Sequence, residues 1–193
     1  AAFAMRHGLD DKAVRNLELM LELFAAATAP FSPDHFLTDR EVLTAGGKKI
    51  VVYAVPGHTR GQVCFHLPEE EILLSGDHVL PHITPNLSPD LVDPSFSPLE
   101  SYLRSLDRIG GLKVKTVWPS HGEPFGDLEG RVEEIKAHHE QRKCLIGEAL
   151  LGRPKSLVEI SEQIFGGSLD DFSRVLALNE TYVHLQQLER EGT

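Results

Sequence analysis

The spacing of apolar residues changes along the chain from a helical pattern to a strand pattern. Over residues 11 to about 27 they recur every three or four positions, which predicts an amphipathic helix with Asp10 or Asp11 as its cap. The helix-spaced residues are Val14, Leu17, Leu21 and Phe24. A proline-rich stretch ends this helix. Residues 40–55 then predict two strands joined by a Gly46-Gly47 turn, and the segments QVCFHL and EILLSGD predict two more.

Helical spacing returns after a proline- and serine-rich loop over residues 81–98. The pattern predicts a helix at residues 99–109, a buried strand at residues 114–118 and a helix at residues 128–150. A Gly152-Arg153-Pro154 break precedes two further helices that resemble a helix-turn-helix. Alternating helices and strands indicate an α/β fold. We therefore predict two domains, residues 1–150 and residues 151–193.

Three apolar strands each run into a Gly or Pro turn with a possible metal ligand at the strand's C-terminal end. They are VVYAVPGHTRGQ with His58, EILLSGDHVL with Asp77, and VKTVWPSHGEP with His121. Strand ends in α/β sheets can bring side chains together on one ligand. Two imidazoles and a carboxylate are ordinary ligands of zinc or iron. Singly, each residue is better explained as a solvated loop histidine or part of a turn, so the hypothesis depends on all three together.

In order and spacing, the PGHT, GD and SHG segments resemble the second half of the metallo-β-lactamase superfamily. The resemblance covers residues 1–150 and implies an α/β fold, the second half of an αββα sandwich, followed by a helical, winged-helix-like unit at residues 151–193. It implies that His58 binds one metal ion, that His121 binds a second, and that Asp77 bridges the two and orients the nucleophile. Two divalent ions are implied, zinc first, with iron or manganese as alternatives.

One part of the family pattern is absent from this sequence. The HxHxDH motif, which supplies the other metal ligands in the first half of the family fold, does not occur. We therefore expect a fragment that holds metal weakly or not at all and has little activity. In the complete enzyme, two metal ions would lower the pKa of a water molecule and generate a hydroxide nucleophile.

The other histidines lack a companion motif. His78 and His82 follow the Asp77 strand end in a loop that could wall a substrate cleft, although packing or solvent exposure is the simpler explanation. His138 and His139 are neighbours in a charged helical segment, and adjacent helix residues point about 100° apart. We therefore expect a solvated helix face there. Structural or surface roles are assigned to the remaining histidines: His7, His35, His66 and His184.

Charge and composition narrow the choice of partner. The net charge of −10 should repel a phosphate backbone, and residues 151–193 carry four basic and seven acidic residues. Nucleic acid is therefore not the expected partner. No run reaches the roughly 18 apolar residues of a membrane span. Cys64 and Cys144 lack a metal-binding spacing, and a reducing, cytoplasmic location follows by elimination.

The expected partner is a small-molecule substrate: an ester, thioester or lactone. The fold and the ligands do not choose among these. Two alternatives stay open. The tail's helix-turn-helix pattern is consistent with an RNA or DNA phosphodiesterase of the same superfamily. A non-catalytic fragment could instead form a homo-oligomer through an apolar stripe on the tail, although packing within the chain explains that stripe equally well. The stripe consists of Val175, Leu178, Tyr182, Leu185 and Leu188.

Overall fold

The structure, a computed structural model, describes residues 2–192. By internal contacts the chain separates into two compact units, which are described separately. The first unit comprises Ala1–His35, Ser88–Pro94 and Arg142–Thr193, and the second comprises Phe36–Leu87 and Ser95–Gln141. The N-terminal and C-terminal segments thus share one unit. The domain boundary after residue 150 stays a prediction.

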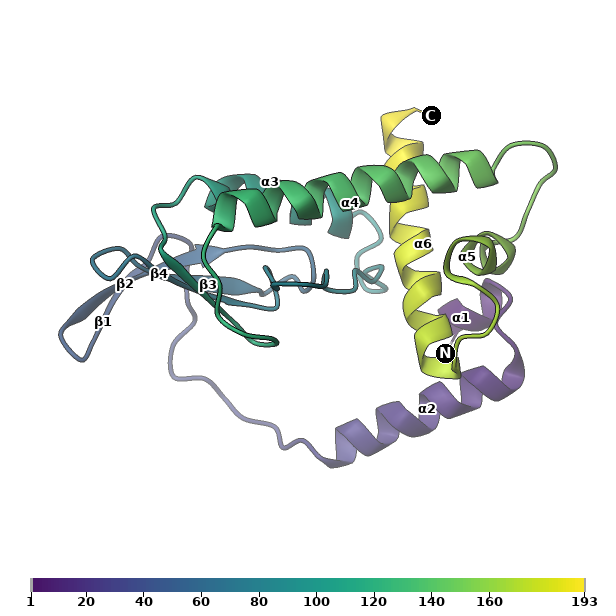
Figure 1. Cartoon of the computed structure of the whole chain (residues 1–193). Helices are drawn as coiled ribbons and strands as arrows, with labels where there is room; N and C mark the ends of the chain where they lie inside the picture. Colours follow the sequence, from purple (N-terminus) through teal and green to yellow (C-terminus); the bar gives the residue numbers. More distant parts are fainter. Residues whose placement is uncertain (1, 193) are drawn as a thin grey trace. The chain divides into compact units, whose positions relative to one another are not determined.

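The second unit is built on a five-stranded sheet with the strand order β1-β2-β3-β4-β5 (Figure 1). Its strands are β1 (Val42–Ala45), β2 (Lys48–Ala54), β3 (Val63–Leu67), β4 (Ile72–Gly76) and β5 (Thr116–Pro119). Neighbouring strands are antiparallel except β4 and β5, which are parallel. Gly46 and Gly47 have φ angles of 58° and 76°, the left-handed values that a two-residue hairpin turn needs. The predicted hairpin is therefore present.

Helix α3 (Pro98–Gly110) lies in the long connection between the parallel strands β4 and β5. One of its faces is fully buried, with apolar side chains at helical spacing. These side chains are Leu99, Tyr102, Leu106 and Ile109. In Figure 1 the helix lies over one face of the sheet. The Ser105 hydroxyl donates to the carbonyl of Pro56, 2.9 Å away, and so ties α3 to the loop after β2.

Burial alternates along the strands at this end of the sheet. Leu73 and Val117 are fully buried, whereas their neighbours Leu74 and Trp118 are 41% and 51% exposed. Successive side chains of a strand point to opposite faces. The predicted strand at residues 114–118 is therefore buried on one face only.

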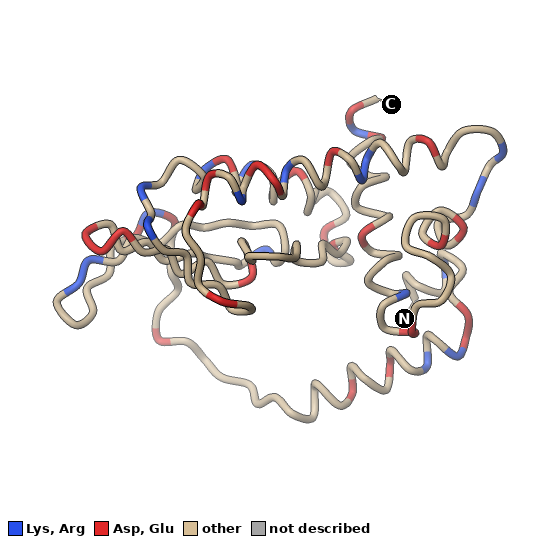
Figure 2. Tube along the Cα trace, viewed as in Figure 1, with Lys and Arg blue, Asp and Glu red and all other residues tan. Residues whose placement is uncertain are grey.

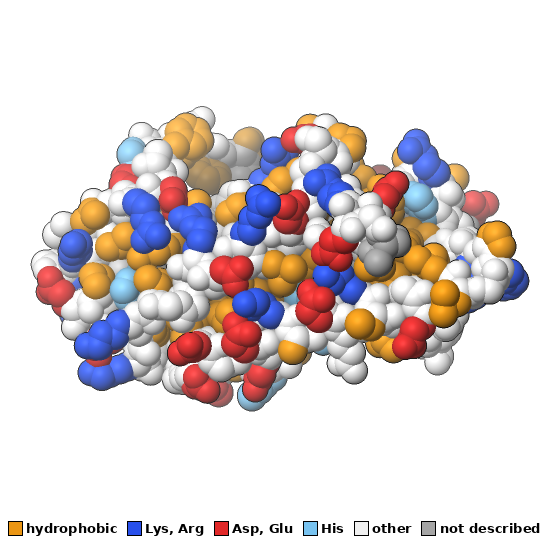
Figure 3. All heavy atoms as spheres, turned by 90° about the horizontal axis from the view of Figure 1, so that it is seen from above, with side chains coloured by type: hydrophobic (Ala, Val, Ile, Leu, Met, Phe, Trp, Pro, Cys, Tyr) orange, Lys and Arg blue, Asp and Glu red, His pale blue; other side chains and the backbone are white. Residues whose placement is uncertain are grey.

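Helix α4 (Leu128–Ala149) begins in the second unit and ends in the first. Its buried residues in the second unit include Leu128, Val132 and Ile135, at helical spacing. Charged residues of both signs share its other faces, and Lys136 pairs with Glu133 and with Asp107 of α3. Figure 2 shows acidic and basic residues interspersed along α4. Figure 3 shows the same mixture on the face seen from above.

The first unit is helical. It contains α1 (Ala2–Arg6), α2 (Asp11–Ala26), α5 (Leu157–Phe165) and α6 (Asp171–Glu191). One buried cluster joins the N-terminal helices to α5 and α6: Ala4, Leu9, Ala13, Val14, Leu157, Val175 and Leu178. A second joins the end of α4 to α5 and α6, through Ile146, Ala149 and Ile160 with the partly buried Ile164, Leu185 and Leu188. The predicted apolar stripe of the tail therefore packs within this unit.

Only the N-terminal part of helix α2 is covered by the other helices of this unit. Val14 is 4% exposed, but Leu21 and Phe24 are 51% and 61% exposed although they follow the same helical spacing. The amphipathic pattern therefore predicted the helix correctly and its burial only at the N-terminal end. Within residues 2–192, no helix has both the length and the apolar character needed to cross a membrane.

A capping box begins helix α5, and it gives a first stability prediction. The Ser156 side chain accepts from the Glu159 backbone N–H, and the Glu159 carboxylate accepts from the Ser156 N–H at 2.7 Å. We expect Ser156→Ala to lower the stability of α5 by about 1 kcal/mol. Amide hydrogen exchange of α5 measures this, with Ser168→Ala at an exposed loop position as the control. Equal exchange rates in both variants would contradict the capping role.

Candidate metal centre

The structure brings His58, Asp77 and His121 together at the ends of their strands, as predicted. The His58 Nε2 lies 3.7 Å from Asp77 Oδ2, and the His121 Nε2 lies 3.5 Å from Asp77 Oδ1. The two imidazoles therefore face different oxygens of one carboxylate. The side chains of His58 and Asp77 are 28% and 34% exposed, and that of His121 is 71% exposed. All three belong to the second unit.

The parallel pairing of β4 and β5 explains why Asp77 and His121 meet. Both strands end at the same edge of the sheet, and the Ser120 N–H donates to the Gly76 carbonyl at 3.1 Å. Gly76 has a φ of 55°, a left-handed value that suits glycine. The register shifts between Leu74 and Gly76, so the strand changes direction just before the carboxylate.

The orientation of His58 is set by a backbone carbonyl. Its Nδ1 lies 2.8 Å from the carbonyl oxygen of Asn86. Because a carbonyl can only accept, Nδ1 carries a proton, and in the neutral ring Nε2 then has a lone pair facing Asp77. Metal-binding histidines commonly have this arrangement, with the second ring nitrogen held by a carbonyl or carboxylate. A backbone oxygen of a distant loop leaves no residue-type signal in the sequence.

Ser120 is a site residue that the sequence analysis did not assign. Its hydroxyl donates to Asp77 Oδ1, the oxygen that faces His121. The contact holds the carboxylate from the strand end that also carries His121. Its position immediately before His121, in the SHG segment, was the available signal.

The two loop histidines suggested as substrate-proximal have different surroundings. His78 is fully buried, with its ring edge-on to Tyr102 at 5.0 Å, and the Tyr102 hydroxyl donates to its carbonyl at 2.8 Å. Burial lowers the pKa of His78 to about 3, so the ring is neutral. His82 is exposed in the following loop. A role for either residue in walling a substrate cleft stays a prediction.

The expectation of a solvated face at His138 and His139 is wrong for His139. That side chain is fully buried, and its ring lies edge-on to Tyr102 with the ring centroids 5.6 Å apart. His138 is half-buried. Adjacent helix residues point in different directions, so a charged segment can still place one imidazole inside.

Gly57 holds the loop that carries His58 against α3. Its φ is 151°, and a Cβ there would lie 2.5 Å from the Tyr102 Cβ and 2.6 Å from the Tyr102 Cα. Since the Tyr102 backbone cannot move cheaply, we expect Gly57→Ala to destabilise the second unit by about 3 kcal/mol.

Guanidinium unfolding followed by the fluorescence of Trp118, the single tryptophan, measures this effect. Gly61→Ala is the matched control, because a Cβ at Gly61 meets nothing within 4 Å. Unfolding midpoints that coincide for the two variants would show that the close approach of Gly57 to α3 is not required.

Comparison with known proteins shows which family the chain belongs to. The family model of the metallo-beta-lactamase superfamily matches residues 2–121. The chain belongs to this superfamily. A solved metallo-beta-lactamase family protein from Thermus thermophilus is 34% identical with a TM-score of 0.82, and the match covers 99% of this chain and 58% of that one. A beta-lactamase domain protein from Burkholderia ambifaria is 30% identical with a TM-score of 0.78, over 84% of this chain and 49% of that one.

A curated relative carries a more specific name. The atrochrysone carboxyl ACP thioesterase of Claviceps purpurea is 26% identical, over 77% of this chain and 47% of its own length. The chain thus spans about half the length of the relatives it matches.

Membership of the metallo-beta-lactamase superfamily implies divalent metal binding, and the donor set at the three strand ends fits it. Zinc binds histidine nitrogen and carboxylate oxygen at about 2.1 Å, so two ligands of one tetrahedral zinc stand roughly 3.4 Å apart. The separations of 3.7 and 3.5 Å are close to this value. The geometry therefore fits His58, Asp77 and His121 as the residues that could hold the metal, and their role as ligands stays a prediction.

Proposed function

We propose that this chain is part of a metal-dependent hydrolase, with a dinuclear zinc centre, that cleaves a small ester, thioester or lactone. One observation carries the proposal: two imidazole Nε2 atoms face the two oxygens of a single carboxylate. A carboxylate shared in this way suits a residue that bridges two metal ions. The thioesterase name of a curated relative supports an acyl substrate.

The chain's own residues would orient the reaction. Bound divalent ions would supply an acidified water and polarise the substrate carbonyl. The Asn86 carbonyl fixes the tautomer of His58, which keeps Nε2 available as a ligand. The Ser120 hydroxyl donates a hydrogen bond to Asp77 Oδ1 and so limits rotation of the Asp77 carboxylate. Asp77 can then accept a hydrogen bond from the attacking water and direct its lone pair toward the carbonyl.

A substrate panel tests this proposal on the full-length protein loaded with zinc. We expect turnover of acyl thioesters, simple esters or lactones, and loss of that turnover on treatment with a chelator. A phosphodiester belongs in the same panel, because it would be cleaved if the nuclease alternative were correct. Turnover that survives complete removal of metal, or cleavage of the phosphodiester alone, would overturn the proposal.

A further inference from the structure

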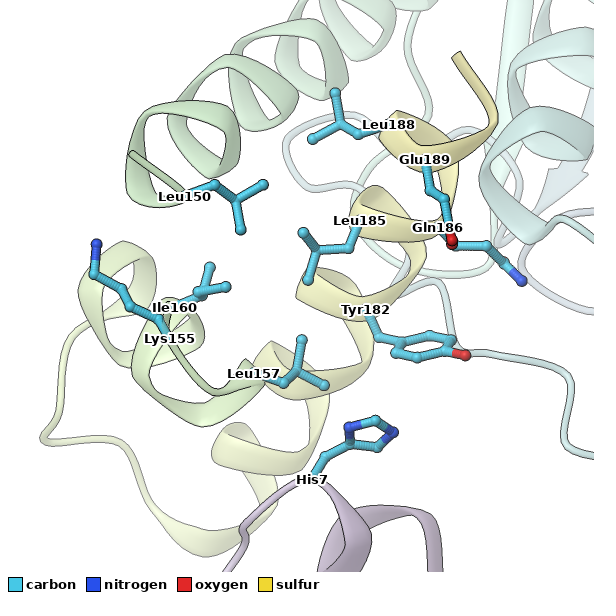
Figure 4. A pocket seen from close by; sticks show the side chains of 10 residues that line it. All are labelled: His7, Leu150, Lys155, Leu157, Ile160, Tyr182, Leu185, Gln186, Leu188 and Glu189. Atoms are coloured by element: carbon cyan, nitrogen blue, oxygen red, sulfur yellow. The ribbon is translucent and has the colours of Figure 1, made fainter. Parts of the chain in front are cut away.

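The first unit contains a hollow that the proposed hydrolase site does not use. Its volume is about 490 Å³, within the range of roughly 300–1,000 Å³ that is typical of small-molecule sites. Apolar side chains from α5, α6 and the turn after α4 line it, and Figure 4 shows them facing the hollow from different sides. These side chains are Leu150, Leu157, Ile160, Leu185 and Leu188. Such a wall suits an aliphatic chain, because burial of apolar surface is favourable and non-directional.

The charged groups at the rim balance each other. Lys155 and Glu189 each line the hollow, and Figure 4 shows them on opposite sides of it. Lys155 already donates to the carbonyl of Ala149 at the end of α4. The net charge of these two side chains is therefore zero, so an ionised ligand would find no excess of opposite charge here. It would also lose its hydration on entering an apolar hollow. This favours an uncharged ligand.

Two polar rings stand together at one end of the hollow. The rings of His7 and Tyr182 lie 5.4 Å apart, and both line the wall. Burial lowers the pKa of His7, with a smaller contribution from Arg6, so the imidazole is neutral at pH 7. A neutral imidazole and a phenol can each donate and accept a hydrogen bond. His7 can therefore hold a neutral polar group at the end of an aliphatic chain, whereas Figure 4 shows the Tyr182 hydroxyl pointing away from the leucine side chains.

We propose that this hollow binds one uncharged aliphatic molecule, an acyl or alkyl chain whose amide, ester or hydroxyl group is held by His7. The volume, the leucine and isoleucine wall, the balanced rim charges and the imidazole of His7 all favour this class. The site lies wholly in the first unit. It does not depend on the metal centre or on the proposed hydrolase activity.

A fluorescence titration with N-phenyl-1-naphthylamine, a neutral apolar probe, tests whether the hollow is a binding site. Leu150 lines the hollow and is 46% exposed, so Leu150→Trp should obstruct its mouth without disturbing the buried core. We expect probe affinity to fall about tenfold or more in this variant. The matched control is Leu151→Trp, because Leu151 is 73% exposed and is not part of the lining.

Equal probe affinity in the two variants would overturn the proposal, since the probe would then be binding to exposed apolar side chains elsewhere. Light scattering separates a further outcome. If probe affinity fell as the chain associated with itself, and Leu150→Trp shifted that association, the hollow would be an interface between copies and not a ligand site.

A ligand series tests the proposed chemical class. Decanamide and decan-1-ol should displace the probe at concentrations at least about tenfold lower than decanoate or decylammonium. In the variant His7→Phe, which keeps a ring but removes the imidazole nitrogens, we expect decanamide to lose its advantage over the ions while the probe still binds. A preference for either ion in the original chain, or an unchanged advantage of decanamide in His7→Phe, would contradict the assignment.

Discussion

Replacing Asp77 by asparagine in the full-length protein should reduce hydrolysis about a thousandfold or more, because a bridging ligand supports both metal ions and the attacking water. Asparagine keeps the shape of the side chain but removes its charge. The Ser120 hydroxyl, which donates to Asp77 Oδ1, can still donate to an amide oxygen at that position. The fold should therefore persist while metal content falls. Turnover and bound metal per protein molecule are measured on the same sample.

Asp107→Asn is the matched control for this substitution. Asp107 lies in the same unit, on α3, and pairs with Lys136. Its side chain is 60% exposed, and exposed ion pairs contribute little to stability. We expect unchanged turnover and metal content in this variant. An Asp77→Asn protein with normal metal content and normal turnover would remove Asp77 from the site.

Local sequence patterns predicted the elements well because their causes are local. Two glycines with left-handed φ angles form the β1–β2 turn, and regular apolar spacing gives α3 and α4. The three candidate ligand positions were predicted from the order of the PGHT, GD and SHG segments. The approach of Asp77 to His121 depends on the parallel pairing of β4 with β5, which a single strand pattern does not encode.

Features that depend on long-range packing were harder to predict. His139 is buried because Tyr102 of α3 lies against it, which the charged sequence around it conceals. Leu21 and Phe24 continue the helical pattern of α2 but extend past the residues that cover Val14. The support that the Asn86 carbonyl gives to His58 comes from the backbone of a distant loop. In each case the presence or absence of a packing partner is set by residues remote in sequence, and residue type alone does not reveal it.

We expect the 193-residue chain alone to bind zinc about a hundredfold or more weakly than the full-length protein, because each metal ion would have too few protein ligands. His58 and Asp77 would hold one ion, and Asp77 and His121 the other, so each ion would have two protein ligands. Catalytic zinc normally has three protein ligands and a water. The exposure of His121, at 71%, adds to the weakness because solvent competes for that position.

Competition with a chromophoric chelator measures zinc affinity for the chain and for the full-length protein side by side. His58→Ala and His121→Ala in the chain should lower its remaining affinity further, whereas His35→Ala, at an exposed position far from the site in sequence, should not.

Two zinc ions bound by the chain as tightly as by the full-length protein would refute the ligand count. Other residues, with His78 and His82 as the first to substitute, would then have to complete the site. The buried His78 would need to turn away from Tyr102 to bind zinc. Loss of the His78–Tyr102 ring contact would therefore identify His78 as the added ligand.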